Sequence, residues 1–296
     1  MKDRFYYETK KLKGVKIYKN IDIREDITFK ISTIFSYKIE VYSFIAVKRI
    51  FELLKKYKKE YFVIGKGSNV LFSKVYYDCV LIKFAPFKSK YLNIVTSGES
   101  LNYINDSYLK LGISSLDFLC GVPCSIGGAI YMNAGAFDES ISKIIEFVYG
   151  YDIDNNRYKV FNNNECLFEY RDSYFKHHNI IILGAKIKIN YMDKKDLELQ
   201  HNNRLMTRRK KMPLEYPNIG SIFKNPQGHY AGKLIADLGL KGLRIGGSMI
   251  SYKHANVIVN YNECKGIEVL KLIEIIEEEV YIKYKINLER EIIVFK

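Results

Sequence analysis

The stretch Val63-Ile64-Gly65-Lys66-Gly67-Ser68-Asn69-Val70-Leu71 places two glycines and a lysine between two short apolar runs. It is not a Walker loop, because Gly67 follows Lys66 where that loop needs Ser or Thr to bind magnesium. It is not a G-x-G-x-x-G dinucleotide fingerprint, since position 70 is Val. What remains is a strand, a glycine turn and a second strand. Glycines allow positive φ, so the N–H groups of such a turn can surround an anion. An ordinary turn between two strands explains the same residues.

Apolar spacing predicts helices and strands on both sides of this turn. Residues 42–56 read as a helix with Ser43 as its N-cap, and a second helix begins at Ser100 and ends at Gly112. The charged segment after Tyr191 predicts a helix at a domain junction, and residues 269–280 predict a long amphipathic helix. Strands are expected at 61–64, 70–72, 79–84, 93–96, 145–152, 157–161 and 179–189, and the terminal INLEREIIVF is strand-like. The predicted class is α+β with mixed sheets.

Composition narrows the possible classes of protein. The 296 residues suffice for two or three cores, and 48% hydrophobic with 27% charged residues is typical of a globular chain. The net charge of +14 raises the alternative of a basic nucleic-acid-binding protein. The lysines are spread from Lys2 to Lys296 rather than clustered, so we expect no nucleic-acid partner. Basic steering of an acidic substrate is a more modest consequence.

The cysteines and the apolar runs indicate the compartment. Five cysteines without paired C-x-x-C spacing predict neither a disulfide framework nor a zinc site, so we expect no metal. The N-terminus lacks the apolar core of a signal peptide, and no run approaches the ~20 apolar residues of a membrane span. We expect a cytoplasmic monomer without a membrane partner.

Three further stretches carry candidate chemistry. Residues 121–137, GVPCSIGGAIYMNAGAF, are dense in small residues that let a backbone approach a ligand, or that simply fill a tight loop. In Tyr170-Arg171-Asp172-Ser173, an arginine fixed by its neighbours could hold a carboxylate, or form a surface ion pair. In residues 217–226, PNIGSIFKNP, Ser221 follows Gly220 in a turn, without the context of a hydrolase nucleophile.

Together these motifs resemble one family. GKGSN, GVPCSIGGAIYMNAGAF, YRDSYFK, NIGSIFKNP, AGKLIADLGLKG, HANVIVN and LEREI follow each other as in UDP-N-acetylenolpyruvoylglucosamine reductases, over roughly residues 20–296. The resemblance implies an FAD-binding fold of the para-cresol-methylhydroxylase type, built from two α+β subdomains, and an α+β substrate domain. The implied limits are 1–62 with 286–296 for the first subdomain, 63–195 for the second, and 196–285 for the substrate domain.

The resemblance also implies the reaction and its participants. NADPH would reduce the bound FAD, and the enolpyruvyl ether of a UDP-sugar would then be reduced to UDP-N-acetylmuramate for peptidoglycan synthesis. Arg171, Ser221 and Glu291 match the catalytic residues: a fixed cation, the proton donor, and a carboxyl that can act as a neutral donor. The implied cofactor-binding residues are Gly65, Lys66, Gly67, Ser68, Asn69, Gly121, Pro123, Ser125, Gly127, Gly128, Asn133 and Gly135. The implied substrate-binding residues are Arg208, Lys211, Asn225, His254 and Asn256.

The chain departs from the family pattern at three places. Lys30-Ile31-Ser32-Thr33 stands where many members have Arg-Ile-Gly-Gly, Cys124 replaces a glycine, and Asp138-Glu139 ends the second motif. The compact segment between Arg171 and Ser221 resembles the subtype without an inserted substrate lid. An FAD-dependent oxidase of the same fold, acting on an alcohol or sugar, is the competing enzyme. Its covalent members tether flavin through His or Cys, which GKGSN lacks and Cys124 could supply.

Overall fold

The computed structural model describes residues 3–87 and 89–296. The chain forms two compact units. Unit 1 comprises the residues up to Ile21, then 35–66 and 78–205; unit 2 comprises 22–34, 67–77 and 206–296. Helix α6 (Lys194–Lys211) contains the boundary between Leu205 and Met206.

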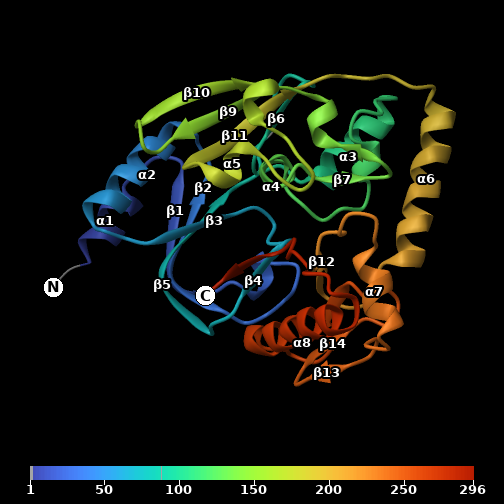
Figure 1. The fold of residues 1–296 in the computed structure, drawn as a ribbon. Coiled ribbons are helices and arrows are strands. Elements are labelled where there is room, and N and C mark those ends of the chain that lie inside the picture. The colour runs from blue at the N-terminus through green and yellow to red at the C-terminus, as the bar shows by residue number, and fades with distance from the viewer. Residues whose placement is uncertain (1–2, 88) are drawn as a thin grey trace. The chain divides into compact units, whose positions relative to one another are not determined.

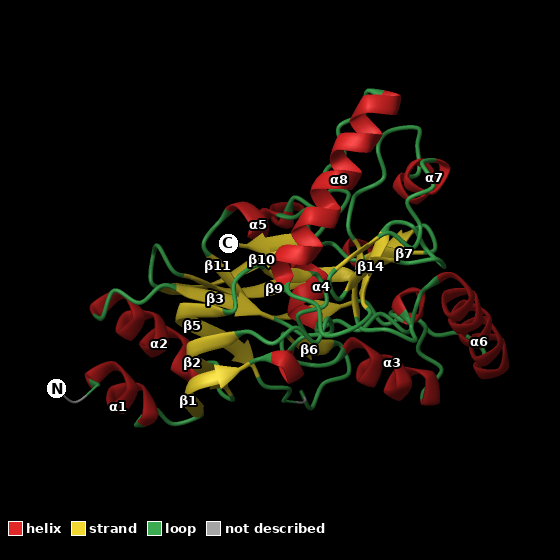
Figure 2. Cartoon of the chain, turned by 90° about the horizontal axis from the view of Figure 1, so that it is seen from below, coloured by secondary structure: helices red, strands yellow, loops and turns green. Residues whose placement is uncertain are grey.

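Unit 1 contains two four-stranded sheets. The first has the order β1 (Val15–Asp22), β2 (Ile34–Val41), β5 (Tyr76–Phe84), β3 (Tyr61–Ile64). Helices α1 (Arg4–Lys10) and α2 (Ile45–Lys56) contact each other and lie beside this sheet, near the N-terminus of the chain (Figure 2). The apolar face of α2, including Val47, Ile50 and Leu54, is buried in the core that these elements share.

The second sheet of unit 1 is antiparallel where β9, β10 and β11 lie side by side (Figure 1). Its order is β10 (Arg157–Asn162), β9 (Ile145–Asp152), β11 (Ile180–Ile187), β6 (Ile94–Thr96). Its core includes side chains of α3 (Leu101–Lys110), α4 (Ile126–Tyr131) and α5 (Tyr174–His177). A short hairpin, β7 (Gly135–Ala136) and β8 (Glu139–Ser140), follows α4. Short 3₁₀ turns lie at Asp117–Leu119, Ile141–Lys143 and Asn164–Cys166.

Unit 2 contains one four-stranded sheet and one parallel strand pair. The sheet has the order β12 (Asn218–Ser221), β15 (Val257–Asn260), β14 (Ser248–Ile250), β13 (Arg244–Ile245). Helices α7 (Ala231–Asp237) and α8 (Gly266–Tyr284) accompany it, and α8 contacts β13 and β14. The last strand, β16 (Ile293–Phe295), pairs with β4 (Val70–Phe72), directly after the glycine turn. A 3₁₀ turn, Arg24–Asp26, also belongs here.

The predicted α+β class is confirmed, and two predicted details are wrong. Helix α2 begins at Ile45 rather than behind a Ser43 cap, and Phe44, at the cap position, packs on Phe84 and Phe87 instead. The strand expected at the C-terminus covers only Ile293–Phe295. The preceding residues 289–291 form one isolated β-bridge between Arg290 and Phe223, with flanking hydrogen bonds to Ile222 and Lys224, and this pairing does not extend into a regular ladder.

Candidate functional site

The glycine turn between β3 and β4 requires glycine at position 67. The φ of Gly67 is +60°, and a Cβ there would overlap the side chain of Ile27. The Thr28 hydroxyl lies 3.3 Å from the carbonyl oxygen of Gly67 and 2.9 Å from that of Asn218, where β12 begins. One hydroxyl therefore joins the turn to the strand that ends in Ser221.

The first half of the turn packs against the second glycine stretch within unit 1. A Cβ at Gly65 would overlap Oγ of Ser125, so only glycine fits at this approach. The Lys66 ammonium donates a hydrogen bond to Oγ of Ser100 at 2.7 Å. Two motifs that lie far apart in the sequence are thus brought together by small residues.

The N-terminal turn of α4 presents closely packed backbone. Ser125 caps the helix by accepting the N–H of Gly128 at 3.3 Å. The N–H of Gly127 donates to the Ser97 carbonyl at 2.9 Å, and a Cβ at Gly127 would lie 2.9 Å from that of Ser97. At Gly128, by contrast, a Cβ would meet only Oγ of Ser125 within 4 Å, so this face is open.

Ser97 is a polar group that sequence reasoning missed. It is buried beside Gly127, and among the described residues its Oγ has no hydrogen-bond partner. A buried hydroxyl normally finds a partner. An unpaired hydroxyl next to an open glycine backbone fits the polar atoms of a dinucleotide such as FAD. The signal was the run Thr96-Ser97-Gly98-Glu99-Ser100, small and polar at the end of a strand.

The rest of the second glycine stretch is tightly folded. Gly121 has a φ of +72°, and Pro123 is exposed. Asn133 donates its amide to the Glu169 carbonyl at 2.7 Å and accepts the N–H of Ser142 at 3.2 Å. The amide of Asn133 therefore fixes this loop to two other segments of unit 1.

Arg171 is held by the glycine stretch. Its Nη2 donates to the carbonyl of Gly135 at 2.9 Å, and its φ is +57°. Asp172, expected to fix this arginine, binds His177 at 2.9 Å and Lys176 at 3.5 Å. Burial raises the pKa of Asp172, but hydrogen bonds from His177 and from a backbone N–H outweigh it, and the pKa is lowered. The Arg171 guanidinium is thus oriented through a backbone carbonyl.

Ser221 ends β12 in a bulged turn of unit 2. The pairing of β12 with β15 shifts between Asn218 and Ser221, where Gly220 has a φ of +75°. No atom lies within 4 Å of a Cβ built on Gly220, so its conformation, rather than lack of space, favours glycine. The Asn218 side chain accepts the N–H of Gly220 at 3.1 Å and thereby fixes the turn that presents Ser221.

The C-terminal segment 289–291 runs antiparallel beside 222–224. The N–H of Lys224 donates to the Glu289 carbonyl at 2.8 Å, and the N–H of Glu291 donates to the Ile222 carbonyl at 2.7 Å. Ile222 directly follows Ser221, so unit 2 brings the expected proton donor and the expected glutamate onto neighbouring backbone. The amide of Asn69 also donates to the Glu291 carbonyl, at 3.0 Å.

Two predicted substrate residues bind the protein's own backbone. Asn256 is buried, accepts the N–H of Phe223 at 3.0 Å and donates to the same residue's carbonyl at 2.8 Å. Asn225 accepts the N–H of Ala231 at 3.1 Å, where α7 begins. In this structure both amides shape the loop that follows Ser221.

The other predicted substrate residues are basic. Arg208 and Lys211 lie in the last turn of α6. His254 is partly buried, and Nδ1 of its ring has no partner among the described residues. Burial lowers the pKa of His254, and the positive charges of Lys241 and Lys211 lower it further. His254 is therefore neutral near pH 7, as a hydrogen-bonding group rather than a cation.

Asp117, Cys120 and His201 form a buried cluster with metal-binding side chains. Nδ1 of His201 lies 2.5 Å from Oδ1 of Asp117, and Arg204 binds the other carboxylate oxygen at 2.8 Å. Two ligands of one tetrahedral zinc ion, with bonds of about 2.0–2.1 Å, would be about 3.3 Å apart. The cluster is therefore a hydrogen-bonded ion network that anchors α6 within unit 1.

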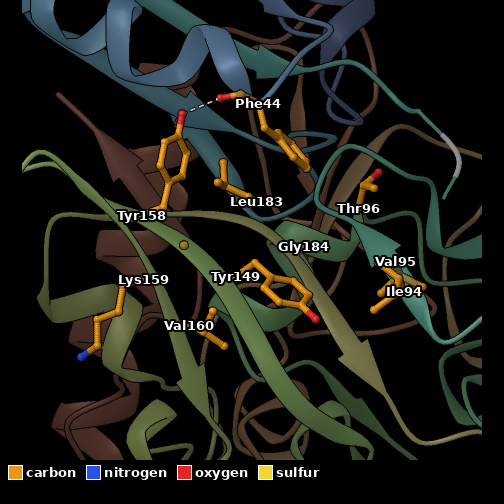
Figure 3. A pocket seen from close by; sticks show the side chains of 11 residues that line it. Phe44, Ile94, Val95, Thr96, Tyr149, Tyr158, Lys159, Val160, Leu183 and Gly184 are labelled. Carbon is orange, nitrogen blue, oxygen red and sulfur yellow. Dashed lines mark hydrogen bonds between the residues drawn. The ribbon is translucent and has the colours of Figure 1, made fainter. Parts of the chain in front are cut away.

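An apolar cavity of about 330 Å³ lies elsewhere in unit 1 (Figure 3). Phe44, Tyr149, Tyr158 and Leu183 are among its lining residues, and the Tyr158 hydroxyl donates to the Phe44 carbonyl at 2.8 Å. None of the residues predicted to bind cofactor or substrate lines it. This cavity is therefore not part of the candidate site.

Comparison with known proteins defines the class first. The model of an FAD binding domain matches residues 39–153, which contain the glycine turn and the second glycine stretch. The chain is a flavoprotein, and the expected FAD-binding domain is confirmed.

The remaining matches define the family. The C-terminal domain of UDP-N-acetylenolpyruvoylglucosamine reductase matches residues 212–295. The reductase of Caldicellulosiruptor bescii is 36% identical over 94% of this chain and 90% of its own length. The reductase of Clostridium novyi is 31% identical over 96% of this chain and 94% of its own length. This chain belongs to the UDP-N-acetylenolpyruvoylglucosamine reductase family, as the sequence motifs predicted.

A solved structure agrees with this assignment. The UDP-N-acetylenolpyruvylglucosamine reductase of Thermus caldophilus is 27% identical and superposes with a TM-score of 0.80, covering 95% of this chain and 99% of that one. Among the helices described here, none is long and apolar enough to cross a bilayer.

Proposed function

We propose that this protein reduces the enolpyruvyl group of UDP-N-acetylglucosamine enolpyruvate to UDP-N-acetylmuramate, with NADPH as the reductant. The family assignment supports the reaction. The observation that carries the catalytic assignment is the pairing of 222–224 with 289–291, which places Ser221 and Glu291 on adjacent backbone.

FAD, when bound, supplies the chemistry that accepts a hydride from NADPH and gives it to the methylene carbon of the enolpyruvyl group. The residues proposed to hold it are Gly65 to Asn69 and, in the second stretch, Gly121, Pro123, Ser125, Gly127, Gly128, Asn133 and Gly135. We add Ser97, whose buried hydroxyl lacks a partner among the described residues. Several of these glycines leave room only for backbone, so their N–H groups are the natural donors to a pyrophosphate.

Arg171 is proposed to bind the substrate carboxylate. Hydride addition leaves negative charge on the neighbouring carbon, delocalised into that carboxylate. A guanidinium held in advance by the Gly135 carbonyl can stabilise this charge without reorganising.

Ser221 is proposed to protonate the carbon that carries this charge. Its hydroxyl is a weak acid, but the enolate-like carbon is basic enough to take the proton within hydrogen-bond reach. Solvent then returns a proton to the serine. We propose that Glu291 hydrogen-bonds the same developing charge as a neutral carboxyl.

We propose that Arg208 and Lys211 bind the diphosphate of the UDP group and that His254 lines the substrate cleft. Asn225 and Asn256 are given a second role beside substrate contact, since their amides shape the loop after Ser221. We also propose that the chain divides into a first FAD-binding subdomain at 1–62 with 286–296, a second at 63–195, and a substrate domain at 196–285.

We also propose a cytoplasmic location and a monomeric state. Cys79, Cys166 and Cys264 are buried thiols outside any disulfide, which is typical of a reducing compartment.

Anaerobic mixing tests the function. NADPH should bleach the visible flavin absorbance, and UDP-N-acetylglucosamine enolpyruvate should restore it in the absence of oxygen while UDP-N-acetylmuramate forms. Recovery of the absorbance only after oxygen is admitted would contradict the proposal and favour the oxidase alternative.

A further inference from the structure

The residue next to Glu291 makes a two-pronged ion pair with helix α8. Nε of Arg290 lies 2.5 Å from Oε1 of Glu277, and Nη2 lies 2.6 Å from Oε2. Each side chain is 28% exposed, so solvent only partly screens the pair. Two parallel N–H···O bonds fix both the distance and the orientation of the guanidinium.

The helix that carries Glu277 is firmly held. Ile273, Ile276 and Val280 of α8 are buried, whereas Glu278 and Glu279 face solvent. Glu277 therefore presents its carboxylate from a helix packed on the core of unit 2. A segment that binds Glu277 is therefore held at a fixed position relative to α8.

The segment that carries Glu291 is also held by its backbone. The N–H of Lys224 donates to the Glu289 carbonyl, and the carbonyl of Ile222 and the amide of Asn69 bind the backbone of Glu291, while the regular strand β16 starts only at Ile293. Glu289 pairs with Lys224 at 2.6 Å, but its side chain is 69% exposed, so that pair contributes little. The Arg290–Glu277 pair is the stronger of these two side-chain attachments.

We propose that the Arg290–Glu277 ion pair is a positioning device for Glu291, resting on the catalytic role proposed for that glutamate. Adjacent side chains of an extended segment point to opposite sides. Anchoring Arg290 on α8 therefore directs Glu291 away from α8. Together with the backbone hydrogen bonds to 222–224, the pair limits how far the segment can slide, and hence the distance between Glu291 and Ser221.

This role requires the two parallel hydrogen bonds of the guanidinium and not merely its positive charge. Lysine is a single flexible point charge and cannot bind both oxygens of Glu277 in a fixed plane. A catalytic group misplaced by about 1 Å can cost about 10²-fold in rate. Arg290→Lys and Glu277→Gln should therefore slow the step that uses Glu291 while the chain stays folded.

Rapid mixing of the FAD-loaded enzyme separates the two half-reactions. We expect Arg290→Lys and Glu277→Gln to slow flavin-to-substrate transfer by about 10–10²-fold. NADPH-to-flavin transfer, FAD content and Tm should match those of Glu278→Gln, an exposed control with the same change of charge. The double variant Arg290→Glu/Glu277→Arg, which restores a two-pronged pair, should recover part of the lost rate.

The outcomes that overturn the inference are distinct. Equal slowing of both half-reactions, or a lowered Tm with unchanged transfer to substrate, makes the pair merely structural. Glu291→Ala, measured alongside, separates this inference from the proposed function. If Glu291→Ala slows transfer to substrate and neither ion-pair variant does, only the positioning role fails. If Glu291→Ala has no effect, the catalytic role of Glu291 fails, and the positioning role fails with it.

Discussion

At the scale of single residues, asparagines of the candidate site use their amides on the protein's own backbone. Asn69 binds the carbonyl of Glu291, Asn133 links two loops of unit 1, and Asn256 binds both backbone groups of Phe223. An amide offers a donor and an acceptor at fixed geometry, so it can pin irregular segments that no ladder holds. In these motifs, asparagine contributes to the shape of the site whether or not it also touches a ligand.

Ser221 is where a single oxygen should matter most. Ser221→Ala should leave reduction of the flavin by NADPH nearly intact, because that half-reaction needs no proton at the substrate carbon. Transfer to the enolpyruvyl group should slow by more than about 10²-fold. Rapid-mixing absorbance measurements resolve the two steps.

The control for this prediction is Ser248→Ala. Ser248 is buried in the same unit, and its hydroxyl donates to the Ile245 carbonyl at 2.8 Å. Loss of that bond should lower the stability of the protein but leave the rates of both half-reactions unchanged. Equal slowing of the two steps by Ser221→Ala would mark Ser221 as structural.

The sequence motifs named candidate residues for the chemistry, but they did not indicate which contacts hold those residues in place. Arg171 was recognised from its motif, but its bond to the Gly135 carbonyl joins positions 36 apart. Thr28 joins Gly67 and Asn218 across still larger separations. Such contacts depend on how distant turns approach one another, which local spacing does not encode.

At the scale of elements, α6 shows how a polar helix is held. Its charged composition predicted a helix, yet Leu197 and His201 are its buried residues, so it has little apolar area to pack. His201 and Arg204 instead bind the buried Asp117. The sequence could not reveal this partner, which lies 84 and 87 positions away from them.

Asp117→Asn should therefore loosen α6. Removing this carboxylate leaves Arg204 without its buried partner, and breaking a buried pair typically costs about 3–5 kcal/mol. Backbone amides of residues 194–205 should then exchange with solvent about 10²-fold faster or more, since every 1.4 kcal/mol is tenfold.

Glu52→Gln is the matched control, because Glu52 pairs with Arg49 on the exposed side of α2. An exposed pair contributes about 0.2–1 kcal/mol, so exchange in α6 should be unchanged. Protection of α6 that survives Asp117→Asn would show that other contacts hold the helix.

The ends of elements were predicted less well than their existence. The strands at 61–64, 70–72 and 145–152 fall where the apolar runs indicated. Helix α2 instead starts where Phe44 enters an aromatic cluster, and the last strand is short because residues 289–291 pair with 222–224 through one isolated bridge rather than continuing the pairing of β16 with β4. In both cases tertiary contacts outweighed the local pattern.

At the scale of the whole molecule, the order of motifs along the chain was more informative than the composition. The net charge of +14 fits many classes of protein. A glycine turn, a second glycine stretch and a C-terminal glutamate motif in this order fit one family, and the comparisons confirm it. The strand orders, and the return of β16 to β4, were not predictable, because strand pairing joins distant segments.

The purified protein should be yellow and should release FAD, not FMN, when it is denatured. The glycine turn and the second glycine stretch supply enough backbone for a pyrophosphate, which FMN lacks. A ligand that binds only the folded state stabilises it by about 2.7 kcal/mol at one hundred times its Kd. Adding FAD to the flavin-free protein should therefore raise Tm more than the same concentration of FMN, as chromatography and calorimetry can check. A colourless protein that takes up no FAD would contradict both this prediction and the proposed reaction, because the hydride would then have no carrier.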